Sequence, residues 1–290
     1  MSAYDSILVA VDGSDSAEAA ARAAVRFADA FDADISGVSA IQKHDISLLS
    51  DSETELELDE AAAGAVEDLE SRAADAGVAC RTVVARGAAH EVISAYTDQL
   101  DADLVAMGTH GRTGLDRLLL GSVAERTLRT SDVPVFVTPE NAGAPTIDSV
   151  LVPTDGSDTA VRAADHGIAV ARRFDATVHV VSAVDVRTIS AAYETGPAIP
   201  EIVAKLESDH RAAVDTVVER AEAHDLDVAT AVPQGPPARL LREYADEEDV
   251  DLVAMGTHGR SGLERHLIGS TTERLVRTSP APVVAVPPAE

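Results

Sequence analysis

A long internal repeat constrains the fold of this chain more than any other feature of its sequence. Residues 103–115 recur at residues 251–263 with one conservative change, at an offset of 148. Residues 7–15 have a looser counterpart at residues 150–158, at an offset of 143. Solenoid repeats have periods of about 20 to 50 residues, so a period this long means that each copy is a whole domain.

The same repeat predicts where one domain ends and the next begins. The offset increases from 143 to 148 along the chain, which places a small insertion in the middle of the second copy. Residues 139–146 join the copies, and their proline, glycine and asparagine content suits a short linker. We expect a first domain at residues 1–140, a linker at residues 141–146 and a second domain at residues 147–290.

Apolar runs typical of buried strands alternate with longer, alanine-rich stretches of helical spacing. The first of these stretches covers residues 17–31, and Asp15 with Glu18 predicts a capping box at its start. Alternating strands and helices predict a parallel sheet covered on both faces by right-handed crossovers. The expected fold class is α/β, with two tandem open Rossmann-like domains, each containing a five-stranded parallel sheet. Strands are predicted at residues 6–11, 35–40, 78–85, 103–107 and 133–137, and at 149–154, 177–183, 227–232, 250–255 and 282–286.

The charge balance excludes one class of partner. Lys and Arg number 23 against 50 Asp and Glu, which gives a formal net charge of −27. Nucleic acid binding requires a basic face, so nucleic acid is not expected as a partner. The only lysines are Lys43 and Lys205, and this acidic, lysine-poor composition resembles that of proteins from halophilic microbes. Salt should relieve the self-repulsion, because the Debye length is about 3 Å at 1 M.

The sequence contains no features of a membrane or secreted protein. No uncharged apolar run reaches the roughly 18 residues that a membrane span requires. Residues 1–6 lead directly into an apolar strand without a basic region, an apolar signal core or a cleavage site. We therefore expect a cytoplasmic protein without a membrane partner. Cys80 is the only cysteine, and its apolar neighbours predict a small buried strand residue.

The loop after the fourth predicted strand carries a glycine pattern that suits an anion. Ligands of open parallel sheets bind beyond the carboxyl ends of the strands, which is where this loop lies. Gly108 is followed after two residues by Gly111, and after nine more by Gly121 and Ser122. We expect the glycines to allow turns with φ > 0 and to bring backbone N–H groups close to an anion. The second copy has the same spacing, with Gly256, Gly259, Gly269 and Ser270.

A helix is predicted to begin directly after this loop. Ser122 and Glu125 match a capping box, as do Ser270 and Glu273. The free N–H groups and the positive dipole end of each helix would then face the loop, which suits a polyphosphate even in an acidic chain. The residue after the second glycine of each copy can add a charge-assisted contact and is an arginine, Arg112 or Arg260.

On these residues the chain resembles the nucleotide-binding branch of the universal stress proteins. That branch carries G-x-x-G-x9-G-[ST], and both copies match it in full. The resemblance covers nearly the whole chain, because each half also has an opening strand that ends in Asp and a glycine, Gly87 or Gly235, before its third helix. It implies an adenine nucleotide α-hydrolase-like fold and ATP, with Mg²⁺, as the ligand of each half.

The resemblance also implies individual roles. Asp12 and Asp155 would lie beside the adenine and ribose, and Val38 and Val181 would frame the adenine through backbone contacts. The fifth strands of the two halves would pair, which gives an intrachain pseudo-dimer, and further homo-oligomers remain open. The triphosphate would contact Gly108, Gly111, Gly121, Ser122 and Val123 in the first copy and Gly256, Gly259, Gly269, Ser270 and Thr271 in the second.

Simpler interpretations compete with several of these roles. The loop glycines suit ordinary turns, Asp12 and Asp155 suit helix caps, and strand valines are commonly core residues. His110 and His258 lie between the loop glycines, and we expect them to face water or to bond backbone, because a lone histidine is a poor metal site. No metal site built from side chains alone is predicted. A dinucleotide-binding turn and a Walker A loop are excluded, because neither glycine pattern is present.

Three functional hypotheses follow from the sequence. The first is a stress-response binding module that binds ATP in each half and hydrolyses it slowly at most, since no general base or nucleophile is evident. The second is an enzyme related to the adenylating ATP-pyrophosphatases, whose first loop carries S-G-G-x-D-S; residues 12–16 match that pattern only weakly. The third is an interaction protein that works without nucleotide, which the presence of both glycine motifs disfavours.

Overall fold

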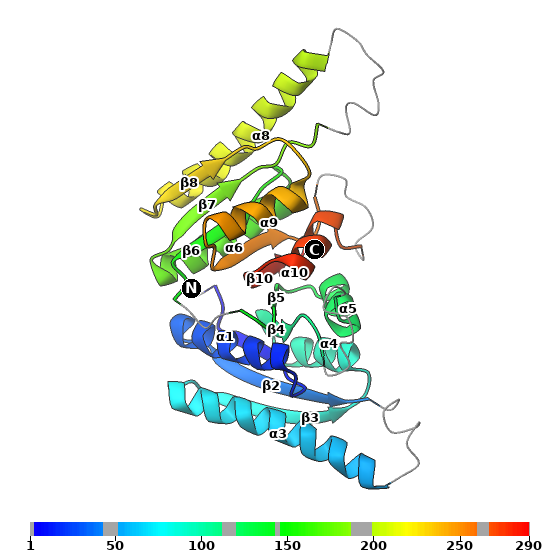
Figure 1. Ribbon diagram of the computed structural model, residues 1–290. Coiled ribbons are helices and arrows are strands. Elements are labelled where there is room, and N and C mark those ends of the chain that lie inside the picture. The colour runs from blue at the N-terminus through cyan, green and yellow to red at the C-terminus, as the bar shows by residue number, and fades with distance from the viewer. Residues whose placement is uncertain are drawn as a thin grey trace. The chain divides into compact units, whose positions relative to one another are not determined.

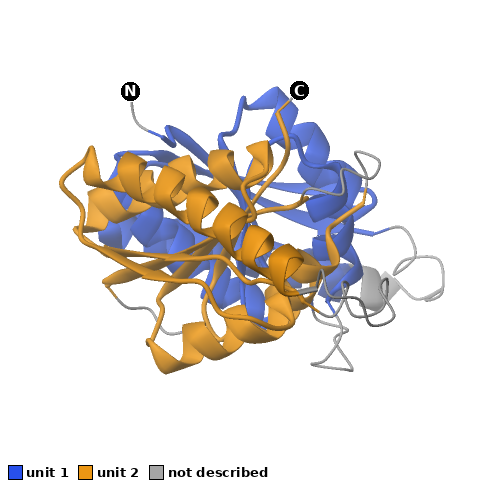
Figure 2. Cartoon of the chain, turned by 90° about the horizontal axis from the view of Figure 1, so that it is seen from above, with its two compact units in different colours: residues 1–144 blue, residues 145–290 orange. Residues whose placement is uncertain are grey.

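The computed structural model describes residues 3–42, 52–111, 120–142, 146–186, 199–259 and 267–289. The chain forms two compact units, residues 1–144 and residues 145–290, which Figure 2 shows in blue and orange. Each unit has its own five strands, its own helices and its own core, and each is described in turn.

The first unit contains a five-stranded sheet in the order β3-β2-β1-β4-β5 (Figure 1). Its strands are β1 (Ser6–Ala10), β2 (Asp34–Ile41), β3 (Cys80–Arg86), β4 (Leu104–Gly108) and β5 (Val135–Thr138). Every neighbouring pair within it is parallel. This order requires the chain to cross back over the sheet between β3 and β4.

Two pairs of helices cover this sheet. The helices are α1 (Asp15–Phe31), α3 (Ser52–Ala76), α4 (Ala89–Gln99) and α5 (Ser122–Thr130). Helices α1 and α3 contact one another, as do α4 and α5. Right-handed crossovers place the first pair on one face of the sheet and the second pair on the other, because the chain reverses its direction of travel across the sheet after β3.

The second unit repeats this topology. Its sheet has the order β8-β7-β6-β9-β10, again with parallel neighbours. The strands are β6 (Ser149–Pro153), β7 (Thr177–Val181), β8 (Val228–Ala231), β9 (Leu252–Gly256) and β10 (Val283–Val286). The helices are α6 (Asp158–Phe174), α8 (Ile199–Glu222), α9 (Pro237–Glu247) and α10 (Ser270–Thr278). The predicted fold class and all ten predicted strands are confirmed, with ends that differ by about two residues.

The cores explain why the strands could be found from sequence. The central strands are buried on both faces, and Ile7, Leu8 and Val9 of β1 are fully inaccessible to solvent. Such strands appear in the sequence as continuous apolar runs. The first unit also gathers an aromatic cluster, in which the rings of Phe27 and Phe136 lie 4.9 Å apart.

The prediction for Cys80 is only partly right. It begins strand β3, as expected, but β3 is an edge strand and the side chain is half-buried rather than buried. Burial, helped by the Glu70 carboxylate, raises the pKa of the thiol to about 11. The thiol is therefore protonated at neutral pH and is a weak nucleophile.

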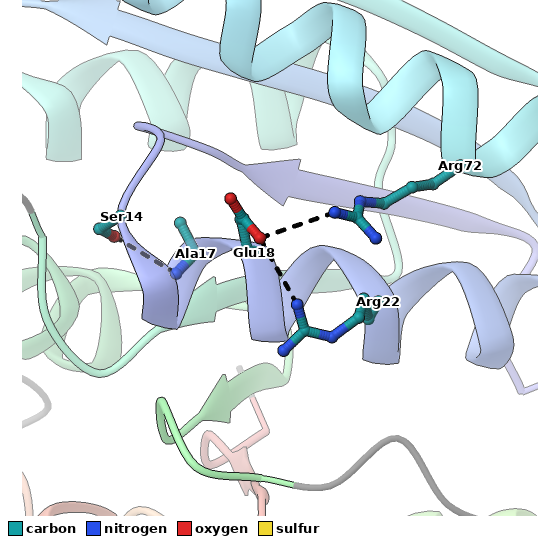
Figure 3. A network of polar contacts seen from close by, with 5 residues as sticks. All are labelled: Ser14, Ala17, Glu18, Arg22 and Arg72. Carbon is teal, nitrogen blue, oxygen red and sulfur yellow. Dashed lines mark hydrogen bonds and ion pairs between the residues drawn. The ribbon is translucent and has the colours of Figure 1, made fainter.

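The predicted capping box of the first helix is wrong by one residue. The N-cap of α1 is Ser14, whose hydroxyl accepts from the Ala17 N–H at 3.3 Å. Glu18 therefore lies one position too far along to close a capping box. Its carboxylate instead lies between the guanidinium groups of Arg22 and Arg72, each at 3.6 Å (Figure 3). The Arg72 contact ties α1 to α3.

Candidate functional site

The candidate site of each half lies at the carboxyl ends of its first and fourth strands. In the first half, β1 has β2 on one side and β4 on the other, so the order of strands reverses between β1 and β4. Loops that leave the sheet at such a reversal diverge and open a crevice, which is where ligands of open α/β sheets bind. The loop after β1 carries Asp12, and the loop after β4 carries Gly111.

The structure brings Asp12 and Gly111 together. One carboxylate oxygen of Asp12, Oδ1, accepts from the backbone N–H of Ser14 at 3.0 Å and from its hydroxyl at 2.6 Å. The other oxygen, Oδ2, lies 2.7 Å from the position that a Cβ on Gly111 would occupy. Any side chain at position 111 would therefore displace the carboxylate. The two loops approach closely only because this residue is glycine.

The second half repeats this arrangement. Asp155 Oδ1 accepts from the Ser157 N–H at 3.0 Å and from its hydroxyl at 2.6 Å. Asp155 Oδ2 lies 2.6 Å from the Cβ position of Gly259. The two crevices therefore share their backbone design as well as their sequence.

The glycines are needed for a different reason from the one predicted. Among the described residues, the glycines with positive φ do not include Gly108, Gly111 or Gly121, so left-handed turns at these three positions were a wrong expectation. A Cβ on Gly108 would lie 2.6 Å from the carbonyl carbon of Ser16, and one on Gly121 would lie 3.0 Å from the Thr109 oxygen. These glycines serve the close approach of backbone segments.

The glycine that does adopt a left-handed conformation lies in the other loop. Gly13 has φ of 79° and its counterpart Gly156 has φ of 78°. Each follows the site aspartate directly and turns the chain from strand to helix, a conformation that favours glycine. An Asp-Gly pair after a strand is a turn signal, so these two glycines could have been predicted from the sequence.

Helix α5 begins at the crevice without a capping side chain. Its N-cap is Gly121, with φ of −61°, and among the described residues no side chain bonds to the first turn. Ser122 is the first helical residue and is exposed, so the predicted capping box with Ser122 as N-cap is wrong by one position. Helix α10 is the same, with Gly269 as N-cap before Ser270. N–H groups left uncapped at a helix start are suited to an anion.

Backbone bonds fix this helix start beside the loop. The N–H of Gly121 donates to the Thr109 carbonyl at 2.8 Å, and the N–H of Gly269 donates to the Thr257 carbonyl, also at 2.8 Å. Val123 and Thr271 follow in the first turns of α5 and α10. The predicted phosphate-binding residues are therefore adjacent in each half. Arg112 and Arg260 lie outside the described residues.

His110 is held by its own loop. Its Nδ1 lies 2.9 Å from the Thr109 hydroxyl, and its backbone carbonyl accepts from the hydroxyl of Ser16. The ring atom Nε2 is buried and has no hydrogen-bond partner within the part of the chain that the structure describes. That same part contains no group of three or more His, Cys, Asp or Glu side chains suited to a metal ion.

The structure places Val38 inside the sheet. The Val38 carbonyl accepts from the Val11 N–H at 2.9 Å, and the Val181 carbonyl accepts from the Thr154 N–H at 3.0 Å. Backbone groups of a strand point alternately to its two neighbours, so the next residue facing the β1 side is Ala40. Ala40 lies beyond the last pair of the β1–β2 register, Ala10 with Val38.

Ala40 is therefore a backbone contact that the sequence analysis missed. Ala183 holds the same place in the second half, because Val181 pairs with Pro153 at the end of β6. The N–H and carbonyl groups of both alanines face the ends of β1 and β6, beyond the last pair of each strand register. Only the register of the strands reveals them, since the side chains carry no signal.

The fold and the site define an open parallel α/β protein with a glycine loop beside a helix start in each half. A model of the universal stress protein family matches residues 3–139 and again residues 146–287. The chain therefore belongs to the universal stress protein family, as two tandem copies.

Relatives and solved structures agree with this assignment. The chain is similar to a universal stress protein of Methanocaldococcus jannaschii, 36% identical over 138 residues, which are 47% of this chain and 80% of that protein. A crystal structure of a universal stress protein from Archaeoglobus fulgidus covers 97% of this chain and 98% of its own, with a TM-score of 0.73 and 22% identity. That second likeness shows the tandem fold.

A universal stress protein solved in complex with cAMP is 27% identical over 49% of this chain and 98% of its own, with a TM-score of 0.36. Among the described residues, the helices are all too short or too polar to cross a membrane.

Proposed function

We propose that the chain binds adenine nucleotide, ATP with Mg²⁺, in one site per half, and that it acts in the cytoplasm as a nucleotide-dependent stress-response module. The observation that carries this proposal is the paired cradle. In each half a glycine approaches the site aspartate so closely that a Cβ would collide with it, and a helix starts there with a glycine N-cap.

The phosphate end of the site is the start of α5 or α10. Its donors are backbone N–H groups, which carry no net charge and therefore suit a chain with a formal charge of −27. Mg²⁺ would fit at the same end. It prefers carboxylate and phosphate oxygens, and Asp12 Oδ2 or Asp155 Oδ2 faces the cradle. When bound, the ion would reduce the repulsion between the triphosphate and the acidic chain.

The base end of the site lies on the other side of β1 or β6. The strand order puts β2 there, and the backbone of Ala40 or Ala183, beyond the last pair of the strand register, offers one donor and one acceptor. Backbone hydrogen bonds would recognise a base that is bound against these groups. Between the two ends, the aspartate after β1 or β6 lies where a ribose would sit.

The test is calorimetric titration of Mg-ATP into the chain in molar KCl. We expect two binding events per chain and a rise in the thermal unfolding temperature. Gly64→Ala serves as a matched control for glycine substitution, because a Cβ there would meet nothing within 4 Å. No heat and no thermal shift would overturn the proposal. Release of pyrophosphate with candidate acceptors would instead favour an adenylating enzyme.

A further inference from the structure

We propose that His210 makes nucleotide binding by the second site depend on pH, whereas the first site lacks this control. The inference rests on the proposed function, since it concerns regulation of the same site. It assigns His210 as a positioning residue that acts through Ser182 and Thr154.

A chain of hydrogen bonds links His210 to the site. The Ser182 hydroxyl donates to the Thr154 carbonyl, and Ser182 Oγ lies 2.8 Å from His210 Nδ1. A hydroxyl has one proton to donate. Because that proton goes to Thr154, His210 Nδ1 must carry a hydrogen and donate it to Ser182. The tautomer of the imidazole follows from this count.

The far end of this chain is the loop that carries the site aspartate. Thr154 directly precedes Asp155, and its own hydroxyl accepts from the Gly156 N–H at 3.2 Å. Asp155 in turn is held by Ser157 and lies against Gly259. A short series of bonded groups therefore holds His210 beside the loop that carries the carboxylate.

The position of Ser182 places the imidazole near the base end of the crevice. Ser182 directly follows β7 and precedes Ala183, whose backbone groups face the β6 side. The order β7-β6-β9 puts this end on one side of β6 and the loop with Gly259 on the other. The imidazole lies near the base end, opposite the predicted phosphate cradle.

Among the residues that the structure describes, the first half has an apolar side chain where the second half has His210. The buried residues of α3 and α8 correspond at an offset of 148, since Leu69 and Val217 are both fully buried, as are Ala73 and Ala221. The counterpart of His210 is therefore Ala62, which is buried as well. The chain thus contains its own control, a related site without the imidazole.

Protonation preserves the link to Ser182 and adds a charge. The neutral tautomer and the imidazolium both carry the Nδ1 hydrogen, so the bond to Ser182 survives in both states. The added proton on Nε2 brings one positive charge close to the loop of Asp155. A nucleotide polyanion and that proton then favour one another, and the coupling is reciprocal.

The surrounding charges are mainly acidic. On α8 the groups are Lys205, Glu207, Asp209 and Arg211, with Lys205 paired to Asp209 at 2.6 Å and Arg211 paired to Glu207 at 3.4 Å. From the loop after β8, Gln234 donates to Glu207. Within the described residues, the neighbouring loops add Asp155, between β6 and α6, and Asp185, after β7. Among these described groups the carboxylates outnumber the two cations, so a further positive charge there is attracted rather than repelled.

The test separates the two sites by substitution. Gly111→Val closes the first site and leaves the second, and Gly259→Val does the reverse. Each variant is titrated with Mg-ATP at pH 8, 7 and 6, in buffers that differ in ionisation enthalpy, with circular dichroism at each pH to show that the chain is folded. ATP titrates in this range too, and the first site corrects for that.

The Gly111→Val variant reports on the second site, and Gly259→Val reports on the first. Between pH 8 and pH 6 we expect the affinity for Mg-ATP to rise about 3- to 10-fold more at the second site than at the first. The second site should also take up more protons on binding. Adding His210→Gln should keep a donor to Ser182 and the affinity at pH 8, but remove the excess pH dependence. Equal pH dependence in both single-site variants, with binding intact, would overturn the inference and leave the proposed function standing. Absence of binding by the unsubstituted chain would overturn the proposed function itself.

Discussion

The two halves build the same cradle but hold it with different side chains. In the first half Ser16 at the start of α1 donates to the His110 carbonyl, which ties the glycine loop to α1. The second half has Thr159 there, with its methyl group against Gly256, and Thr272 of α10 donates to the Gly256 carbonyl at 2.8 Å. The comparison teaches that backbone approach defines the site, while the bonds that secure it are interchangeable.

The largest expected effect concerns the glycine that ends the fourth strand of each half. A Cβ on Gly108 would lie 2.6 and 2.8 Å from backbone atoms of Ser16 and Ala17, which cannot move aside. A Cβ on Gly256 would lie 2.8 Å from the Thr159 methyl carbon, which rotation about χ1 can move, and 3.2 Å from the nearest Thr159 backbone atoms. We expect Gly108→Ala to destabilise its unit by about 3 kcal/mol and Gly256→Ala by about 1 kcal/mol.

Hydrogen exchange resolved to the two units measures this difference. Equal losses of unfolding free energy in the two units would contradict this prediction. They would show that the first helix packs equally closely against the end of the fourth strand in both units. Gly64→Ala is again the control, since its Cβ would have free space and should favour the helix.

Acid should destabilise the second half more than the first. Burial lowers the pKa of His166 to about 4, with Arg162 adding to the effect, and burial also lowers the pKa of His179. The first half has Ala23 and Ser36 at these positions. As pH falls, these histidines therefore bind protons in the unfolded chain before they do so in the folded second unit. Their contribution to the free energy of unfolding of that unit is fully present above about pH 6.5 and is lost as pH falls toward about 4.

Because both imidazoles keep some contact with solvent, we expect a loss of only about 1 to 2 kcal/mol by pH 5. Calorimetric unfolding at pH 7 and pH 5 checks this. The substitutions His166→Ala and His179→Ser, which copy the first half, should abolish the excess loss. If they leave it unchanged, other groups cause the acid sensitivity.

A smaller effect is expected from the side chains that secure each loop. Ser16→Ala removes the nearer of the two hydroxyls at the His110 carbonyl and leaves only that of Ser14 at 3.4 Å. We expect a cost of about 1 kcal/mol to the first unit and a roughly threefold weaker affinity for Mg-ATP at that site. Thr272→Val should cost the second unit a similar amount. Calorimetric unfolding and titration measure both, with Thr159→Ala as the control. An effect of each substitution on the opposite site would contradict the account.

The smallest effect concerns aspartates at helix ends. Asp101 follows α4 and Asp249 follows α9, both in the left-handed conformation with φ of 47° and 48°. A negative charge there opposes the helix dipole. We expect Asp249→Asn to stabilise its unit by about 0.5 kcal/mol in dilute buffer, and Asp101→Asn by less, because Asp249 also has Glu247 and Glu248 beside it.

Molar KCl should remove both gains in stability, because the Debye length at 1 M is about 3 Å and exposed charges are then screened. Thermal unfolding at low and high salt measures the effect. The unsubstituted chain itself should unfold at a higher temperature in molar KCl, as the acidic composition predicts. A gain from Asp249→Asn that persists at high salt would show that its origin is conformational rather than electrostatic.

Most of the fold could be predicted from the sequence, because buried parallel strands leave continuous apolar runs and the repeat supplied each element twice. The register of the helix starts could not. Ser14 and Asp15 are both good N-caps, and a Glu at position 18 fits a capping box one residue too late. The same shift affected Ser122, which is exposed one residue inside its helix, while Gly121 holds the cap.

The remaining site features depend on tertiary contacts that no local pattern encodes. Ala40 is a candidate for a backbone contact with the ligand only because β2 extends beyond the last residue of β1 that pairs with it. Gly108 needs to be glycine because α1 packs against the end of β4, a distant contact. The link between Ser182 and His210 joins a strand end to a helix across 28 residues. The predicted pairing of the fifth strands stays a prediction.

The most direct test of the account is to count nucleotide sites by calorimetric titration of Mg-ATP in molar KCl. A side chain at position 111 or 259 would collide with Asp12 or Asp155, so it should close one cradle only. The account predicts two sites in the unsubstituted chain, one in Gly111→Val, one in Gly259→Val and none in the double variant. Two sites remaining in the double variant, with the fold intact, would show that the paired cradles are not where nucleotide binds.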